Sequence, residues 1–157
     1  MGNYLRRLGF DVFDDWFAAG KIADDEWQAY ETKRGRSYGT ALRGIAARHV
    51  FSLDKHHIDR CDIGVLMLPA GKSGHLELGY MIGQGKPGYV LFEKEPERWD
   101  QMYQFATGVL FEKEALAKAL CDNRRISRGH QIGQKVTGVM CNIRESNTYG
   151  DRYGGID

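Results

Sequence analysis

Apolar and polar residues alternate along this chain in blocks that predict short strands separated by helices. The stretch CDIGVLML (61–68) is apolar almost throughout and predicts a strand buried on both faces, as in a parallel sheet. GYVLF (88–92) repeats this pattern, TGVLF (107–111) predicts a further strand, and FDVF (10–13) predicts an earlier one. Strands that alternate with helices indicate an α/β fold with a mainly parallel sheet.

Helical spacing of apolar residues occupies the stretches between these strands. The expected helices are a first one that stops at Gly9, a long region over 24–57 broken at 34–39, and shorter ones at 73–85 and 112–120. The chain begins inside the first helix, with no strand before it. We therefore expect the first strand of the fold to be missing.

The composition predicts one folded domain followed by a tail. A chain of 157 residues with 42% hydrophobic content can bury one sizeable core but not two ordinary ones. After Cys121 the sequence becomes rich in Gly, Asn, Arg and Ser, and VTGVM is its one short apolar run. We expect the domain to span 1–121 and residues 122–157 to be irregular or disordered.

The charge balance argues against polyanionic partners. The chain has 22 basic and 21 acidic residues, so no overall field attracts nucleic acid or an anionic membrane. Local basic runs at 32–36 and 123–130 lack any accompanying nucleic-acid-binding motif. We expect neither polymeric nucleic acid nor a membrane as a partner.

The cysteines and histidines predict neither a disulfide framework nor a metal site. Cys61, Cys121 and Cys141 are odd in number, far apart and without CxxC spacing, which fits a reducing compartment.

The sequence also has no signal peptide and no apolar stretch of transmembrane length. We expect a soluble cytoplasmic protein.

The stretch PAGKSGHLELG (69–79) follows the best strand and suggests a bound phosphate. A Walker loop would need glycine where Leu66 stands, and Pro69 removes an amide donor at the start of the loop. Gly71, Ser73 and Gly74 still form a strand-to-helix turn whose amides favour an anion such as a monophosphate. The alternative is a tight turn in which Ser73 is simply the N-cap of the helix.

Glu77 is the leading candidate for chemistry. It lies among apolar residues such as Leu76 and Leu78, where a partly desolvated carboxylate can act as nucleophile or as acid and base. The competing interpretation is a capping box, in which Glu77 serves the helix N-terminus together with Ser73 or Gly74.

The run from Cys61 to Phe92 resembles the core motif of the nucleoside 2-deoxyribosyltransferase superfamily. The shared features are a strand opened by Asp62, a small-residue turn, Glu-Leu-Gly-Tyr on a helix, then Gly-Lys-Pro and another strand. The resemblance covers roughly 4–121 and is specific at 61–92. It implies a flavodoxin/Rossmann-like three-layer fold, a homo-oligomer, and chemistry that needs no cofactor or metal.

The resemblance also implies an activity on small nucleosides or nucleotides. By this likeness Glu77 would attack the anomeric carbon of a nucleoside or (deoxy)nucleoside 5′-monophosphate and form a glycosyl-enzyme intermediate. Asp54, eight residues before Asp62, is the best match to the second acid, and Asp59 is the alternative. Base exchange between nucleosides and non-catalytic nucleotide sensing are the rival functions.

Two further segments are expected to contact the substrate. Many transferases of this superfamily carry Asp where this chain has Gly71, and its small neighbours favour a phosphorylated substrate instead. The implied contacts in this turn come from Gly71, Ser73, Gly74 and His75, whereas Lys72 can equally be a solvated side chain.

The segment DDWFAAG (14–20) follows the strand predicted at 10–13, at the same edge of the sheet. Trp16 or Phe17 can stack on a base there, or can pack against the next helix. Asp14 is a candidate polar contact to the substrate.

Overall fold

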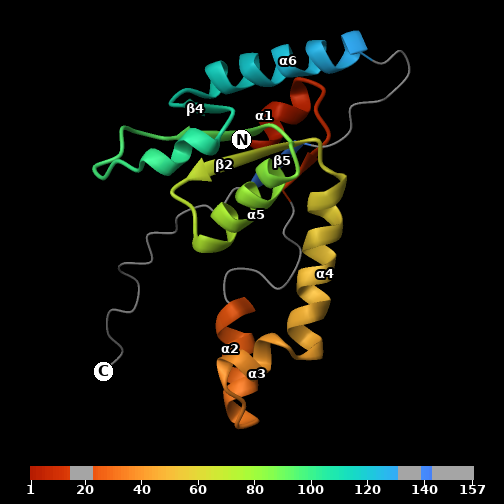
Figure 1. The fold of residues 1–157 in the computed structure, drawn as a ribbon, viewed down its shortest axis with the longest axis vertical. Coiled ribbons are helices and arrows are strands. Elements are labelled where there is room, and N and C mark those ends of the chain that lie inside the picture. The colour runs from red at the N-terminus through yellow and green to blue at the C-terminus, as the bar shows by residue number, and fades with distance from the viewer. Residues whose placement is uncertain (15–22, 131–138, 143–157) are drawn as a thin grey trace, which may run out of the picture.

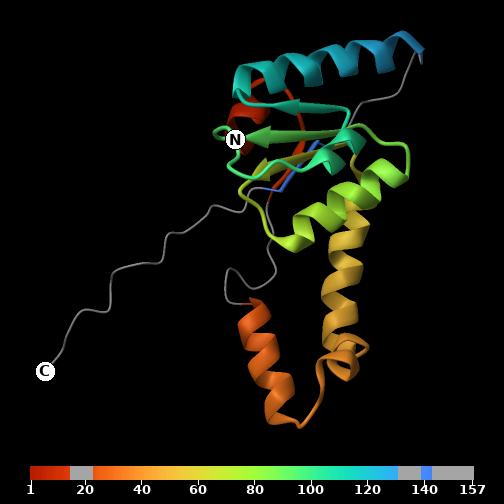
Figure 2. The same ribbon diagram turned by 60° about the vertical axis from the view of Figure 1, so that its left-hand side comes forward.

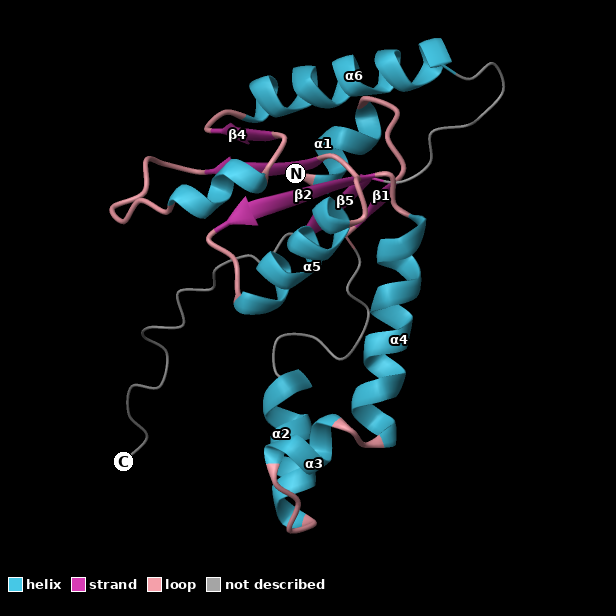
Figure 3. Ribbon diagram, in the orientation of Figure 1, coloured by secondary structure: helices cyan, strands magenta, loops and turns pink. Residues whose placement is uncertain are grey.

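The computed structural model describes residues 1–14, 23–130 and 139–142. Helices and strands alternate through these residues (Figures 1 and 3). In chain order they are α1 (Gly2–Arg7), β1 (Val12–Phe13), α2 (Ala23–Lys33), α3 (Tyr38–Leu42), α4 (Ile45–Arg60), β2 (Ile63–Leu68), α5 (Lys72–Gly83), β3 (Gly88–Phe92), the 3-10 helix η2 (Gln101–Phe105), β4 (Gly108–Leu110), α6 (Lys113–His130) and β5 (Val139–Asn142).

The strands form one sheet in the order β1-β5-β2-β3-β4, and every neighbouring pair is parallel. This confirms the predicted α/β class and parallel sheet. The four strands expected from the apolar pattern all form, within two residues of their predicted limits. The break expected at 34–39 is also present, because α2 ends at Lys33 and α3 begins at Tyr38.

The strand between β1 and β2 comes from the far end of the sequence. Val139 of β5 is paired with Val12 on one side and with Ile63 on the other. The described chain begins with the helix α1, as expected. The position in the sheet between β1 and β2 is occupied by β5. An interior strand lets both neighbours complete their ladder hydrogen bonds.

The expectation of an irregular tail from residue 122 is therefore wrong for the described residues. The helix α6 continues past the proposed boundary to His130, and Val139–Asn142 form β5. The sequence was misleading because a four-residue strand held by two non-local partners needs little apolar periodicity of its own. The remaining tail positions, 131–138 and 143–157, lie outside the described residues.

Helices cover both faces of the sheet (Figures 1 and 2). Alternate residues of the buried strands point to opposite faces, so Val65 packs with α1 and α6 whereas Leu66 packs with α5. The first core cluster contains Leu5, Phe10, Val12, Ile63, Val65, Tyr89, Leu91, Leu116 and Leu120. The opposite face holds Ile58, Cys61, Leu66, Leu78, Met81, Val90 and Phe92.

Two paired glycines allow α5 to lie close to the sheet. Gly64 in β2 is the register partner of Gly88 in β3. A methyl group at Gly88 would lie 2.6 Å from Cγ1 of Ile82, and one at Gly64 would lie 2.9 Å from Cδ1 of Leu78. Both positions thus leave room for side chains of α5, which sets the height of that helix above the sheet.

The helices α2 and α3 and the first turns of α4 project away from the sheet as a helical arm (Figures 1 and 2). Inside the arm, the ring of Trp27 meets Tyr38 edge-on at 6.3 Å, and the buried carboxylate of Glu31 pairs with Arg36 at 3.0 Å. This small core joins α2 to α3 without contribution from the main sheet.

Candidate functional site

The candidate site lies at the carboxyl ends of the parallel strands. All five strands point the same way, so the residues that follow β1 and β2 emerge at one edge of the sheet. Asp14 follows β1, and the turn before α5 follows β2. Ligands of open α/β sheets characteristically bind at this edge.

Glu77 is the sixth residue of α5 and is partly buried. Gly74 and Met81, three residues before it and four after it, are buried against the sheet, so Glu77 borders the sheet-facing stripe of the helix. The N-cap of α5 is Gly71, and Ser73 is its second helical residue. The alternative in which Ser73 is the N-cap is therefore wrong. The capping-box interpretation is wrong as well, because Glu77 lies too far along the helix to cap it.

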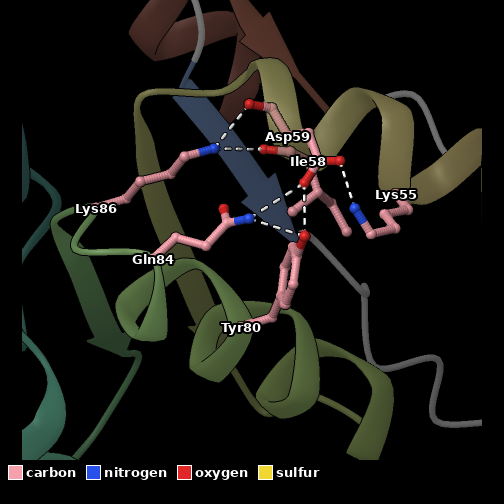
Figure 4. Close-up of polar contacts among 6 residues, drawn as sticks. All are labelled: Lys55, Ile58, Asp59, Tyr80, Gln84 and Lys86. Atoms are coloured by element: carbon pink, nitrogen blue, oxygen red, sulfur yellow. Dashed lines mark hydrogen bonds and ion pairs between the residues drawn. The ribbon is translucent and has the colours of Figure 1, made fainter.

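A polar cluster joins α4 to α5 beside this position (Figure 4). Tyr80 Oη donates a hydrogen bond to Asp59 Oδ1 at 2.8 Å, and Lys55 Nζ lies 2.5 Å from Asp59 Oδ2. The Gln84 amide donates to Tyr80 Oη at 2.8 Å. The hydrogen bonds from Lys55 and Tyr80 lower the pKa of Asp59 to about 2. Asp59 is therefore an anion at neutral pH, held by its partners.

The Gly-Lys-Pro motif at 85–87 also contributes to the contact between α4 and α5, through Lys86. Lys86 Nζ donates to the backbone oxygens of Ile58 at 3.2 Å and Asp59 at 2.8 Å, at the C-terminal end of α4 (Figure 4). A cation there satisfies carbonyls that the helix leaves free and complements its dipole. Gly85 has a φ of +78°, which allows the chain to leave α5 and turn toward β3.

Asp54 lies on a different side of α4 from Asp59. It precedes the buried Ile58 by one turn, so it lies on the sheet-facing side of the helix and is partly buried. Burial raises the pKa of Asp54, although the nearby His57 opposes this effect. The His57 ring stacks on Phe13 of β1 at 4.3 Å, which holds this part of α4 against the sheet.

The helices α4 and α5 lie on either side of β2 in the chain and meet through the contact between Asp59 and Tyr80. Figures 1 and 2 show α4 running across the direction of β2 and away from the sheet. Asp54 lies on α4 five residues before Asp59, and Glu77 lies on α5 three residues before Tyr80.

The turn that precedes α5 is tied to η2 through His75. The Nδ1 atom of His75 lies 3.0 Å from the backbone oxygen of Gly71, and its Nε2 atom lies 2.9 Å from Tyr103 Oη. A carbonyl only accepts, so Nδ1 donates to Gly71, and Nε2 shares the second hydrogen bond with the hydroxyl of Tyr103. His75 was expected to contact the substrate, and both of its ring nitrogens are used to hold the turn.

Tyr103 is a residue that the sequence patterns did not single out. It lies 28 residues from His75, in a segment with no motif, so no local signal linked the two. Its ring meets Phe92 of β3 edge-on at 5.4 Å, and burial raises the pKa of its hydroxyl.

The other residues predicted to contact the substrate from this turn lie at the start of α5. Gly74 is buried, and Gly71 and Ser73 are partly buried.

Asp14 is engaged by a neighbouring helix. Its carboxylate forms an ion pair with Arg6 of α1, and Arg6 also donates to the backbone oxygen of Val12 at 3.1 Å. This contact fixes α1 against the end of β1. Trp16 and Phe17, the candidates for stacking on a base, lie outside the described residues.

Two hollows open on the described surface, and neither is lined by Glu77 or Asp54. The smaller, of about 200 Å³, lies beside α5 and is lined by residues including His75, Leu78 and Tyr103. The larger, of about 390 Å³, lies beyond β3 and β4. Residues 15–22, after β1, and residues 143–157, after β5, lie outside the described residues.

Within the described residues, no three His, Cys, Asp or Glu side chains come together in a way that could hold a metal ion. Nor does any helix of this part of the chain have the length and apolar character needed to cross a membrane. Comparisons with protein-family models, with curated proteins and with solved structures found no match to this chain.

Proposed function

We propose that this protein cleaves the N-glycosidic bond of a nucleoside or (deoxy)nucleoside 5′-monophosphate, with Glu77 as the nucleophile. The observation that carries the proposal is the position of Glu77. Glu77 is a partly buried residue that borders the sheet-facing stripe of α5 and lies too far from Gly71 to serve as a helix cap. A carboxylate on the helix that follows a strand of a parallel sheet, near the edge where ligands bind, is suited to nucleophilic catalysis.

The strand order supports the flavodoxin-like fold that this function implies. The flavodoxin-like order is 2-1-3-4-5, with ligands at the point where the order reverses. The observed order β1-β5-β2-β3-β4 becomes the same series when β5 is counted as the first strand. On that numbering the reversal lies between β5 and β2, and β2 leads directly into the helix that carries Glu77.

In the proposed mechanism, a Glu77 oxygen attacks C1′ of the sugar while the bond from C1′ to the base nitrogen breaks. The departing base takes a proton from Asp54, whose raised pKa favours the protonated form that can donate. Water then attacks C1′ of the glycosyl ester, Asp54 accepts its proton, and the free sugar leaves with Glu77 restored.

A phosphorylated substrate is favoured by the start of α5. This helix has 12 residues, and its first turn contains Ser73 and the buried Gly74. Their small side chains leave the backbone amides at the start of the helix accessible to an anion. Such a turn suits one phosphate group. The contact between His75 and Gly71 would keep the turn in one conformation.

The central experiment compares Glu77→Gln with Glu26→Gln, an exposed control on α2. Base release from nucleoside monophosphates should fall at least about 10³-fold in Glu77→Gln and remain at the wild-type rate in Glu26→Gln. Mass spectrometry of acid-quenched wild type should find the sugar attached to Glu77. Unchanged turnover in Glu77→Gln would contradict the mechanism.

A second pair of variants tests the proton donor. Asp54→Asn should slow base release by about 10²-fold or more, because the amide cannot transfer the proton. Asp59→Asn should retain turnover, since Asp59 is bound in the contact between the helices. The opposite ranking would assign the acid to Asp59.

The same assays separate the rival functions. Formation of a new nucleoside after addition of a free base would identify base exchange. Calorimetric binding of nucleoside monophosphates by wild type without any base release would identify a sensor and reject the hydrolase.

A further inference from the structure

The larger hollow lies at the carboxyl ends of β3 and β4, away from Glu77. Its volume is about 390 Å³. The connection from β3 to β4, including η2, forms most of its wall, and Figure 1 shows that segment at the edge of the sheet remote from β1. The lining of the hollow includes Phe92, Glu95, Trp99, Asp100, Tyr103 and Phe111.

Aromatic rings make up much of the apolar lining of this hollow. The rings of Phe92 and Phe111 stack at 5.5 Å, and Tyr103 meets Phe92 edge-on at 5.4 Å. Trp99 is 80% exposed although it lines the same hollow. An indole exposed to this extent beside a ring cluster leaves its face available to a ligand.

The charged groups of the hollow are all acidic. Glu95 and Asp100 line it, and none of its lining residues in the described chain is Lys, Arg or His. Asp100 Oδ1 accepts the backbone N–H of Met102 at 2.9 Å, which fixes this carboxylate at the start of η2. Lys94 and Arg98 are close in sequence but are not among the lining residues.

We propose that this hollow binds a small organic cation, such as a quaternary ammonium compound. The faces of aromatic rings attract cations, and the indole of tryptophan does so most strongly. A bulky quaternary ammonium group also buries apolar surface against the rings. Glu95 and Asp100 complement the positive charge without competition from a basic side chain in the lining. This site is separate from Glu77 and does not depend on the proposed glycosidase.

Choline and its neutral isostere 3,3-dimethylbutan-1-ol provide the direct test. Calorimetry and the indole N–H resonance of Trp99 in the full chain should report saturable choline binding. The neutral isostere should bind about tenfold more weakly, since it keeps the shape but loses the attraction to rings and carboxylates. Equal binding of the two compounds, or no binding of choline, would overturn the proposal.

Matched variants locate the binding. Trp99→Ala should weaken choline binding about tenfold, and Glu95→Gln about threefold. Phe105→Ala and Glu97→Gln should leave it unchanged, because Phe105 lines only the smaller hollow and Glu97 lines neither. Trp99 and Phe105 are both largely exposed, so neither change should unfold the protein.

Two outcomes of these variants would reject the site. Choline affinity that is insensitive to Trp99→Ala would place the ligand elsewhere. A concentration-dependent dimer that dissociates in Trp99→Ala would show that a second copy of the chain covers the hollow.

Discussion

At the scale of single residues, the two aspartates of α4 show how a small difference in position changes chemistry. Asp54 and Asp59 are five residues apart, which is about 140° around a helix. Asp59 therefore reaches Lys55 and Tyr80, and its pKa falls to about 2, while burial raises the pKa of Asp54. The sequence offered both as the second acid because the register of this helix could not be determined.

The lowered pKa of Asp59 predicts an acid-sensitive part of the protein's stability. A carboxylate whose pKa falls from 3.8 to about 2 on folding stabilises the native state above pH 3.8. That contribution should decline as the pH falls from 3.8 toward 2 and be absent below. Wild type should thus exceed Asp59→Asn in its urea midpoint at pH 5–7, and the difference should vanish near pH 2.

Glu114→Gln is the control for this measurement. It removes a carboxylate that lies 3.7 Å from Lys113 in an exposed pair, which should contribute little. A difference between wild type and Asp59→Asn that persisted unchanged at pH 2 would show that the ion pair is not its source.

At the scale of elements, α5 depends on the strands beneath it as much as on its own sequence. Its apolar spacing was sufficient to predict a helix, but its height is set by Gly64 and Gly88 in the neighbouring strands. Its contact with α4 is set by Tyr80 and Gln84, which bind Asp59. The position of Glu77 follows from these contacts.

A substitution at Gly88 in β3 should therefore disturb the packing of α5, although the sequence of α5 itself is unchanged. Gly88→Ala places a methyl group 2.6 Å from Ile82 and should lower the free energy of unfolding by about 1–3 kcal/mol. Gly79→Ala is the matched control, since among the described residues nothing lies within 4 Å of its added methyl group. It should raise stability by up to about 1 kcal/mol in urea denaturation. Equal stability of both variants would contradict this packing.

At the scale of the whole molecule, the sheet joins segments that are far apart in the sequence, β1 and β5. β5 lies between β1 and β2, so residues 12–13 and 63–66 are held together through residues 139–142. Loss of an interior strand would leave buried backbone groups of both neighbours without partners.

Met140→Pro tests this arrangement. Met140 pairs with Phe13 in β1 and with Gly64 in β2, so proline there removes a donor from an interior ladder. The expected loss is at least about 3 kcal/mol in the free energy of unfolding. Lys94→Pro, in the exposed connection after β3, should cost far less. Near-wild-type stability of Met140→Pro would remove β5 from the sheet.

The sequence by itself determined the elements whose signals are local. Apolar runs located β2 and β3, helical spacing located α5, and the stretch from Cys61 to Phe92 singled out Glu77. The predictions of β2, β3 and α5 succeeded because side-chain periodicity and turn residues act over a few positions, whereas the role of Glu77 stays a proposal. The same local signals suggested Ser73 as an alternative N-cap of α5, whereas the N-cap is Gly71. The start of a helix depends on backbone geometry at a single residue.

Only the tertiary structure decided which distant groups meet. It placed β5 inside the sheet, tied His75 to Tyr103, and separated the environments of Asp54 and Asp59. No local pattern encodes these pairings, because a ladder or a hydrogen bond between remote segments depends on how the whole chain packs. A pKa likewise reflects neighbours and burial, which exist only once the helices lie against the sheet.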